Sequence, residues 1–203
     1  SSAASDVYKR QLINRSNEYD CYMAVKDLHI TEKIIYFDKE SGYKISKFYD
    51  GSKNADAFNK EEMSRCMELL RTLHETDVKV SHRFDIAERI DYYTGLCEKS
   101  GGISFEDVEE VHKNMMLLLD LLKGMKSESR LCHIDSVADN FIITADNKIK
   151  LIDWEYAGMA DPVIDVAMCA IYSYYDKSQA DELLESYLKR KPFTCLLYTS
   201  DAA

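Results

Sequence analysis

The chain has 203 residues, 46% of them hydrophobic and 31% charged, which suits one domain or two small lobes. Its formal net charge of −10 excludes a nucleic-acid binder of the usual kind, because such proteins need excess Lys and Arg to neutralise phosphates. A negative protein can still bind a nucleotide through Mg²⁺ and a few placed donors. No apolar run approaches the roughly 20 residues that a spanning helix needs, so no membrane insertion is predicted.

The cysteines are scattered along the chain and include no CxxC pair. A zinc site or a redox motif is therefore not predicted. Cys66 and Cys169 fall within apolar helical patterns, where a reduced thiol behaves as a small hydrophobe. This usage predicts a reducing, cytoplasmic location.

The two ends differ in character from the chain between them. Residues 1–11 and 196–203 resemble translated sequencing-adapter sequence, so we expect them to be non-native flanks of a chain that was cut at both ends. Lys9 and Arg10 are accordingly given no phosphate-binding role. The alternative is that both segments are natural termini.

The first predicted elements form a small unit over residues 12–50. Residues 12–28 have the apolar spacing of a helix. Residues 34–38 and 43–49 are rich in β-branched and aromatic side chains, and they predict a hairpin around Glu40-Ser41-Gly42. Asp50-Gly51-Ser52 breaks the strand pattern, and we place the boundary with a larger lobe, residues 51–195, at this point.

Three helices are predicted next. The apolar residues of the first recur at helical spacing: Phe58, Met63, Cys66, Met67, Leu70 and Leu73. The second covers residues 86–99 and stops at Gly101-Gly102. The third covers residues 105–122, and its apolar stripe is expected to face the core: Val108, Val111, Met115, Leu118 and Leu122. We interpret each stripe as core rather than as a cofactor site.

The remaining elements are short strands and two helices. Residues 131–133, 141–144 and 149–152 predict strands that polar turns separate. Asp161-Pro162 predicts a helix start, with Asp as the N-cap and Pro in the first helical position. A capping box over residues 178–181 predicts a last helix that ends near Arg190.

One segment has the composition of a phosphoryl-transfer site. Residues 133–140 fit the pattern H-x-D-x-x-x-x-N, and Ile152-Asp153-Trp154-Glu155 follows the next predicted strands. Asp135 suits the carboxylate that orients an attacking hydroxyl and accepts its proton, while Asn140 and Asp153 offer the hard oxygen ligands that Mg²⁺ prefers. Protein kinases use this spacing. The alternative is that Asp135, Asp139 and Asn140 only cap turns.

With Leu151-Ile152-Asp153-Trp154-Glu155-Tyr156-Ala157-Gly158 and Asp161-Pro162-x-x-Asp165, this motif resembles the choline/ethanolamine kinase branch of the aminoglycoside phosphotransferase superfamily. A weaker resemblance reaches back to Leu-Ile-Asn-Arg-x-x-Glu, so that residues 12–192 are covered. The resemblance implies an α+β, protein-kinase-like fold of two lobes, with an incomplete N-lobe and a mostly helical C-lobe.

The resemblance also implies roles for individual residues. Asp135 would be the catalytic base, and Asn140 and Asp153 would hold magnesium. Glu18 would be the helix acid of the nucleotide site, which pairs with a basic phosphate-binding residue; its alternative is an ordinary solvent-facing charge. The family's basic residue and phosphate loop have no counterpart before Leu12.

On the substrate side, Tyr156 would offer its ring to a quaternary ammonium, or else only pack beneath the site. Glu155 would either organise the pocket or line it and attract the substrate cation. His133 would shape the catalytic loop, and Asp165 would support that loop by accepting its hydrogen bonds. The other histidines lie at no metal-ligand spacing and are interpreted as incidental: His29, His74, His82 and His112.

The implied activity is ATP- and Mg²⁺-dependent phosphorylation of a small amino alcohol, with choline as the first candidate. Another hydroxylated cation, such as an aminoglycoside or thiamine, is the closest alternative. A non-catalytic ligand-binding relic of the fold is the alternative from a different class. Because the family's N-terminal strands and C-terminal aromatic helices are not found here, the 203-residue chain itself is expected to be weakly active or inactive.

Overall fold

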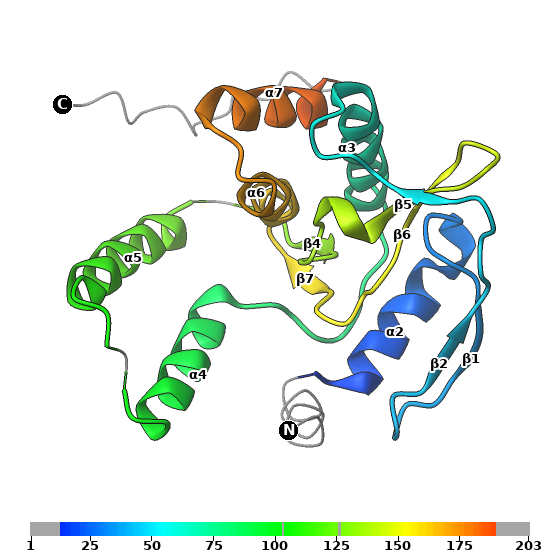
Figure 1. The fold of residues 1–203 in the computed structure, drawn as a ribbon. Coiled ribbons are helices and arrows are strands. Elements are labelled where there is room, and N and C mark those ends of the chain that lie inside the picture. Colours follow the sequence, from blue (N-terminus) through cyan, green and yellow to red (C-terminus); the bar gives the residue numbers. More distant parts are fainter. Residues whose placement is uncertain (1–12, 103, 126, 190–203) are drawn as a thin grey trace.

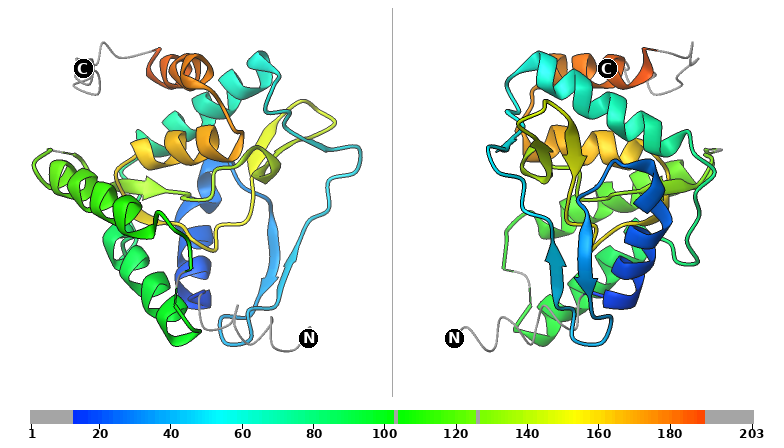
Figure 2. Two further views of the ribbon diagram at one scale, coloured as in Figure 1. Left: turned by 60° about the vertical axis from the view of Figure 1, so that its left-hand side comes forward. Right: turned by 90° about the vertical axis from the view of Figure 1, so that its right-hand side faces the viewer.

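The computed structural model describes residues 13–102, 104–125 and 127–189 (Figure 1). The predicted flanks lie outside the described residues. Small sheets occupy the centre, a helix and a hairpin lie on one side, three helices cover one end, and a helical pair projects from the opposite side (Figures 1 and 2). The described helices are all too short or too polar to cross a membrane.

Helix α2 (Arg15–Val25) opens the described chain and continues into the short helix η1 (Lys26–Leu28). The side-chain oxygen of Asn14 accepts a hydrogen bond from the backbone N–H of Asn17 and thereby caps α2. Strands β1 (Ile34–Phe37) and β2 (Lys44–Ser46) pair antiparallel beside α2, which confirms the predicted hairpin.

Helices α3 (Lys60–His74), α6 (Val163–Tyr172) and α7 (Lys177–Leu188) gather at one end of the molecule (Figure 2). The predicted apolar stripe of α3 is buried from Met63 onward. Phe58 was expected in the same stripe, and that prediction is wrong. It precedes the N-cap residue Asn59 and is 71% exposed.

The other described strands form two small sheets under these helices. Strands β3 (Lys53–Asn54), β5 (Phe141–Ile143) and β6 (Ile149–Leu151) make a three-stranded antiparallel sheet in the order β3-β5-β6. Strand β4 (Arg130–Cys132) pairs antiparallel with β7 (Gly158–Ala160). Three of these strands lie within a residue of their predicted positions, whereas β3 and β7 were not predicted.

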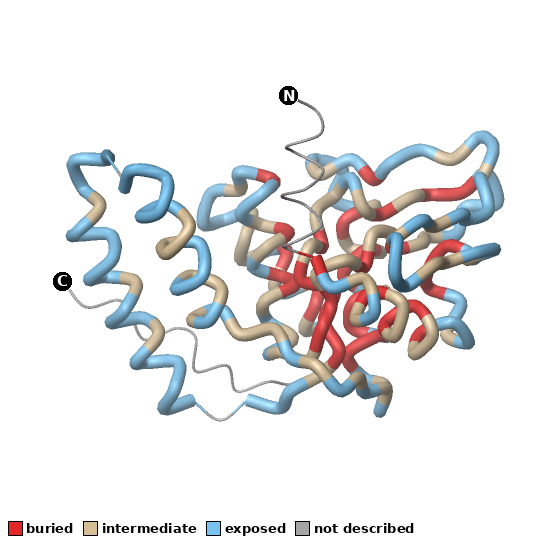
Figure 3. The backbone as a smooth tube through the Cα atoms, turned by 90° about the horizontal axis from the view of Figure 1, so that it is seen from below, coloured by how far each residue is buried: buried red, intermediate tan, exposed pale blue. Residues whose placement is uncertain are grey.

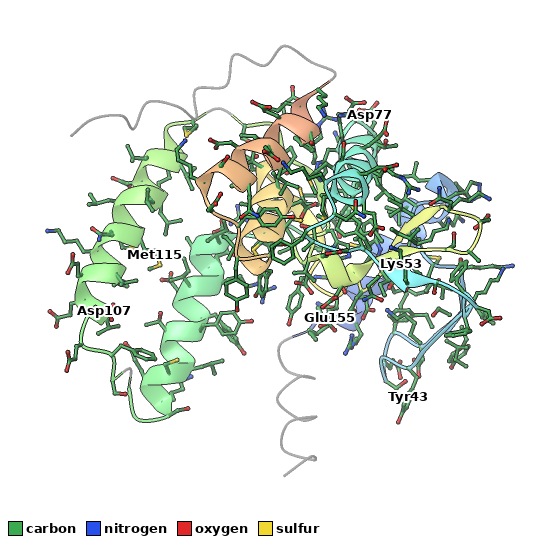
Figure 4. All side chains as sticks on the ribbon, turned by 45° about the horizontal axis from the view of Figure 1, so that its top comes forward. Tyr43, Lys53, Asp77, Asp107, Met115 and Glu155 are labelled. Atoms are coloured by element: carbon green, nitrogen blue, oxygen red, sulfur yellow. The ribbon has the colours of Figure 1, made fainter. Side chains whose placement is uncertain are left out.

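Helices α4 (Ile86–Lys99) and α5 (Val108–Lys123) lie side by side, away from the buried core (Figure 3). The bounds of α4 match the prediction. The expectation that the α5 stripe faces the core is wrong, because no α5 side chain is buried by the described residues. Leu118, for example, is 62% exposed. Met115 points toward α4 instead of into the core (Figure 4).

Two predicted helix starts are shifted. Helix α6 begins at Val163 with Pro162 as its N-cap residue, although the carboxylate of Asp161 still accepts a hydrogen bond from the Val163 N–H. The capping box of α7 is formed by Asp176 and Gln179, two residues before the predicted set. The predicted box at residues 178–181 is therefore wrong, and Arg190 lies outside the described residues.

Candidate active site

The catalytic-loop candidate runs from β4 to β5 through the short helix η2 (Ala138–Asn140). The side-chain amide of Asn140 donates hydrogen bonds to the backbone oxygen of Asp135 at 2.8 Å and to its carboxylate at 3.1 Å. The backbone N–H of Ile152 donates to the backbone oxygen of Asn140 at 2.9 Å. This bond brings Asp153 beside Asp135 and Asn140. Asp135, Asn140 and Asp153 are thus brought together by one loop and one strand end.

Asp153 lies in the left-handed backbone region, with φ 66°, two residues after the end of β6. The next residue, Trp154, anchors the turn, because its ring is fully buried and its indole N–H donates to the Leu151 oxygen at 2.9 Å. The left-handed backbone at Asp153 lets a partly exposed carboxylate stand between the buried residues Leu151 and Trp154. Non-glycine residues in this region are strained and are typical of functional sites.

These side chains fit a hard cation. The Asn140 NH₂ group is committed to Asp135, so the amide oxygen remains to act as a ligand beside the Asp153 carboxylate. Among the described residues, no Lys or Arg lies within ion-pair distance of Asp135 or Asp153. Two carboxylates without a protein cation, next to an amide oxygen, are a donor set that suits Mg²⁺.

Asp165 lies directly beneath the loop and is fully buried. Its two carboxylate oxygens accept hydrogen bonds from the backbone N–H groups of His133, at 2.8 Å, and Ile134, at 2.6 Å. Its backbone oxygen accepts a bond from the Ser136 hydroxyl at 2.6 Å. Ile134 has φ 71°, which is costly for a β-branched residue, so these bonds hold a strained backbone just before Asp135.

His133 is fully buried, and Nε2 lies 2.9 Å from the Ile152 oxygen while the ring packs edge-on against Trp154. Burial lowers the pKa of His133, and the nearby carboxylates, Asp165 first, oppose that effect. A buried neutral imidazole that donates to a backbone oxygen links the catalytic loop to the strand before Asp153. This geometry agrees with a structural part in the loop.

The interpretation of His74 as incidental is wrong. His74 is buried, with Nε2 at 3.0 Å from an Asp165 oxygen and Nδ1 at 2.8 Å from the Tyr187 hydroxyl. Sequence spacing gave no signal, because the partners come from α6 and α7. His82 is not incidental either, since Nε2 lies 2.9 Å from the Ala157 oxygen.

His74, Cys132 and Asp165 bring ligand atoms within 4.8 Å of one another, yet their bonding argues against a metal site. Burial raises the pKa of the Cys132 thiol, with Asp165 adding to the effect. The protonated sulfur donates to the backbone oxygens of Arg130 and Ala160. Asp165 already accepts bonds on both oxygens, so the cluster is satisfied by hydrogen bonds.

Glu18 does not face solvent; it is 1% exposed. One carboxylate oxygen lies 3.0 Å from Nζ of Lys44 on β2, and the other lies 2.6 Å from the Arg15 guanidinium. Lys44 also donates to the Tyr22 hydroxyl at 2.7 Å. Arg15 and Lys44 are therefore both basic partners of Glu18, and sequence reasoning missed Lys44 because that pair spans two elements.

The substrate-side candidates adjoin this cluster. Arg15 donates to the Glu155 carboxylate at 3.3 Å, and Glu155 lies next to α2 (Figure 4). Burial raises the pKa of Glu155, Asp153 adds to the effect, and Arg15 opposes it. Burial also raises the pKa of Tyr156, followed by the charges of Glu155, Tyr93, Asp135 and Asp153. Tyr156 thus lies within the electrostatic reach of the candidate catalytic carboxylates.

Comparison with known proteins agrees with this geometry. A family model described as the Phosphotransferase enzyme family matches residues 42–195. The chain belongs to the phosphotransferase enzyme family. The matched residues include the whole catalytic loop, Asp153 and Asp165.

Several family relatives and solved structures are similar to the chain. Protein LicA of Haemophilus influenzae is 26% identical over 87% of the chain and 52% of that protein. The crystal structure of choline kinase LicA from Streptococcus pneumoniae is 29% identical, with a TM-score of 0.79, over 88% of the chain and 63% of that structure. A structure of LicA in complex with AMP matches equally well, over 62% of its own chain.

A more distant structure shows the fold alone: the ADP-bound aminoglycoside phosphotransferase APH(2'')-Ib is 17% identical, with a TM-score of 0.62, over 87% of the chain and 67% of that structure. The expected kinase-like α+β fold is therefore confirmed. The chain spans between about half and two thirds of the length of the relatives that it matches.

One further candidate residue of this site, Tyr93, was not predicted from the sequence. Tyr93 on α4 is 43% exposed, stacks edge-on with Tyr92 at 5.7 Å, and acts on the pKa of Tyr156. The adjacent residues Tyr92 and Tyr93 were the available signal in the sequence. Only the fold brings Tyr93 within electrostatic range of Tyr156.

Proposed function

We propose that the chain is the catalytic part of an ATP-dependent phosphotransferase that phosphorylates the hydroxyl of a small amino alcohol, choline first and ethanolamine second. The observation that carries the proposal is the hydrogen bonding of Asn140 to Asp135, next to Asp153. This arrangement combines one oriented carboxylate with two oxygen ligands. Family membership and the fold of the LicA structures support the reaction class.

Asp135 is the proposed catalytic base. The Asn140 amide fixes its carboxylate from one side, so the remaining oxygen can accept a hydrogen bond from the substrate hydroxyl and take its proton as the phosphoryl group transfers. Asn140 and Asp153 are the proposed ligands for Mg²⁺, which when bound neutralises charge on the nucleotide phosphates. Glu18 is proposed to hold the Lys44 ammonium at the nucleotide side of the site.

Choline is the first candidate because of the residues after Asp153. The partly exposed Tyr156 ring can bind a quaternary ammonium by a cation–π contact, and the Glu155 carboxylate adds negative charge. The LicA structure named a choline kinase supports the same choice. An aminoglycoside or thiamine remains the alternative acceptor, since either is a hydroxylated cation and the fold is shared with APH(2'')-Ib.

The test measures nucleotide binding and turnover on the same purified chain. Mg·ATP is expected to raise the melting temperature, because a ligand that binds only the folded state stabilises it. ADP formation is then followed with choline, ethanolamine, thiamine or an aminoglycoside as acceptor. Because the chain covers only part of its relatives' length, binding is scored separately from turnover, which we expect to be weak.

Asp135→Asn is expected to abolish turnover while Mg·ATP still raises the melting temperature. Asp139→Asn is the matched control, because Asp139 lies in the same loop with an exposed side chain. Unchanged turnover by Asp135→Asn would remove the proposed base. Preferred turnover of another cation would replace choline. A chain that neither Mg·ATP nor choline stabilises would lack a competent site.

A further inference from the structure

A chain of buried hydrogen bonds extends from α7 to the catalytic loop. The Tyr187 hydroxyl lies 2.8 Å from Nδ1 of His74, and Nε2 of His74 lies 3.0 Å from the Asp165 carboxylate. That carboxylate accepts the backbone N–H groups of His133 and Ile134. The three side chains come from α7, α3 and α6 and are 9%, 4% and 0% exposed.

Donor and acceptor chemistry assigns a direction to this series of hydrogen bonds. An ionised carboxylate only accepts hydrogen bonds, so Nε2 of His74 must carry a proton toward Asp165. If the imidazole carries only that proton, Nδ1 is an acceptor and the Tyr187 hydroxyl donates to it. Burial raises the pKa of Tyr187, and Cys132 and Asp165 add to the effect, so the hydroxyl keeps its proton.

Helix α7 is itself held in place at this point. The Arg71 guanidinium donates to the backbone oxygens of Tyr187, at 3.0 Å, and Ser186, at 3.4 Å. These oxygens belong to the last turn of α7, where carbonyl groups lack partners within the helix. Tyr187 is therefore fixed by its backbone as well as by its ring, which packs edge-on against His74.

The series of hydrogen bonds ends at a strained part of the catalytic loop. Ile134 holds φ at 71° immediately before Asp135, and the bond from its N–H to Asp165 is the contact that opposes relaxation. If Asp165 shifts, the backbone at residues 133–134 relaxes and the Asp135 carboxylate moves with it. A small displacement of a catalytic group costs a large part of its effect on rate.

We propose that Tyr187 is a positioning residue, which acts through His74 and Asp165 to hold the strained backbone that carries Asp135. The catalytic consequence rests on the proposed phosphotransferase function, whereas the structural consequence does not. Loss of the Tyr187 hydroxyl leaves Nδ1 of His74 without its donor, frees the imidazole to exchange tautomers, and loosens the hold of Asp165 on the loop.

The test uses amide hydrogen exchange in the purified chain, which needs no turnover. In Tyr187→Phe, the His133 and Ile134 amides are expected to exchange about 5- to 10-fold faster, because one buried hydrogen bond is removed from the series that ends at these amides. The Leu151 amide, which bonds to the Ile30 oxygen, serves as the internal reference and should change less than twofold. Tyr172→Phe, at a 59% exposed ring, is the matched control and should leave all three amides unchanged.

A second variant separates hydrogen bonding from packing. In His74→Gln the amide NH₂ can still donate to Asp165, so the loop amides should exchange more slowly than in His74→Leu. Nitrogen-15 NMR of labelled histidine should show a proton on Nε2 of His74 in the parent chain. If His74→Leu fails to fold, Tyr187→Phe decides alone, because it removes a single oxygen.

Turnover provides the catalytic arm. Tyr187→Phe is expected to lower kcat about 3- to 10-fold and to leave the KM for ATP within twofold, since the nucleotide ligands are untouched. Equal exchange at residues 133–134 in Tyr187→Phe and the parent chain would overturn the inference, as would acceleration of Leu151 by the same factor. A parent chain that neither Mg·ATP nor choline stabilises contradicts the proposed function alone, because the exchange result stands independently.

Discussion

Lys44 donates a hydrogen bond from its ammonium to the buried carboxylate of Glu18 at 3.0 Å, and this pair joins β2 to α2. The Arg15 guanidinium binds the other carboxylate oxygen and also reaches Glu155. One buried acid therefore connects the hairpin, the first described helix and the segment after Asp153. The buried charge of Glu18 is compensated by the half-buried side chains of Lys44 and Arg15.

Removal of Lys44 should be costly because Glu18 would keep its burial and lose a partner. Lys44→Met is expected to lower the free energy of unfolding by about 1–3 kcal/mol. The double variant with Glu18→Gln should recover part of this loss, since residue 18 then carries no charge. Lys47→Met, on an exposed residue of the same segment, should change stability by less than about 0.5 kcal/mol. Denaturant unfolding measures each value, and equal effects of the two lysine variants would contradict the argument.

Glu155 should give stability a distinctive pH dependence. Burial, with a smaller part from Asp153, raises the pKa of its carboxyl above the ordinary value of about 4.3, despite the opposing charge of Arg15. The folded state thus binds the proton more tightly, and the contribution of Glu155 to stability falls as pH rises from the ordinary to the raised pKa. Relative to the parent chain, Glu155→Gln should gain stability between pH 4 and pH 7. A relative loss over this range, measured by unfolding at each pH, would show that the sign is wrong.

Leucines of the two apolar stripes should differ sharply in their contribution to stability. Leu70 on α3 is fully buried, so Leu70→Ala should lower the free energy of unfolding by about 2–5 kcal/mol. Leu118 on α5 is 62% exposed, so Leu118→Ala should cost less than about 0.5 kcal/mol. Thermal or denaturant unfolding compares the pair directly. A comparable loss for Leu118→Ala would mean that the α5 stripe is covered in solution.

The start of α7 offers a test of helix capping. Asp176→Ala should destabilise the chain by about 1 kcal/mol, because the carboxylate accepts the backbone N–H of Gln179 at 2.9 Å. Ser178→Ala, at the position expected from the sequence pattern, should be nearly neutral. The two melting temperatures distinguish the observed capping box from the predicted one, and a larger effect of Ser178→Ala would reverse the assignment.

The sequence predicted best what depends on local pattern. The bounds of α4, the hairpin and the strands around the catalytic loop follow from apolar spacing and turn residues within each segment. The α5 stripe shows the limit of this reasoning: helical periodicity identifies an apolar face, but it does not identify what covers that face.

The site was predictable to the same extent. Asp135, Asn140 and Asp153 share one loop and strand end, so their spacing in the sequence nearly determines their proximity. Lys44 and His74 were missed because their partners, Glu18 and Asp165, lie on other elements. A single Lys on a strand or a single His on a helix has no periodic signature, and only tertiary packing reveals the pair.

The pairing of β3 with β5 has a consequence for how the chain folds. Lys53 pairs with Ile143, and helices α3, α4 and α5 lie between them in the chain. During synthesis these helices must leave the ribosome before the central sheet can form, so the early chain has helices but no completed catalytic lobe. Closure of such a long loop is entropically slow compared with helix formation. The rate at which this protein folds should therefore be governed by the late arrival of β5, which directly follows the residues proposed to catalyse phosphoryl transfer.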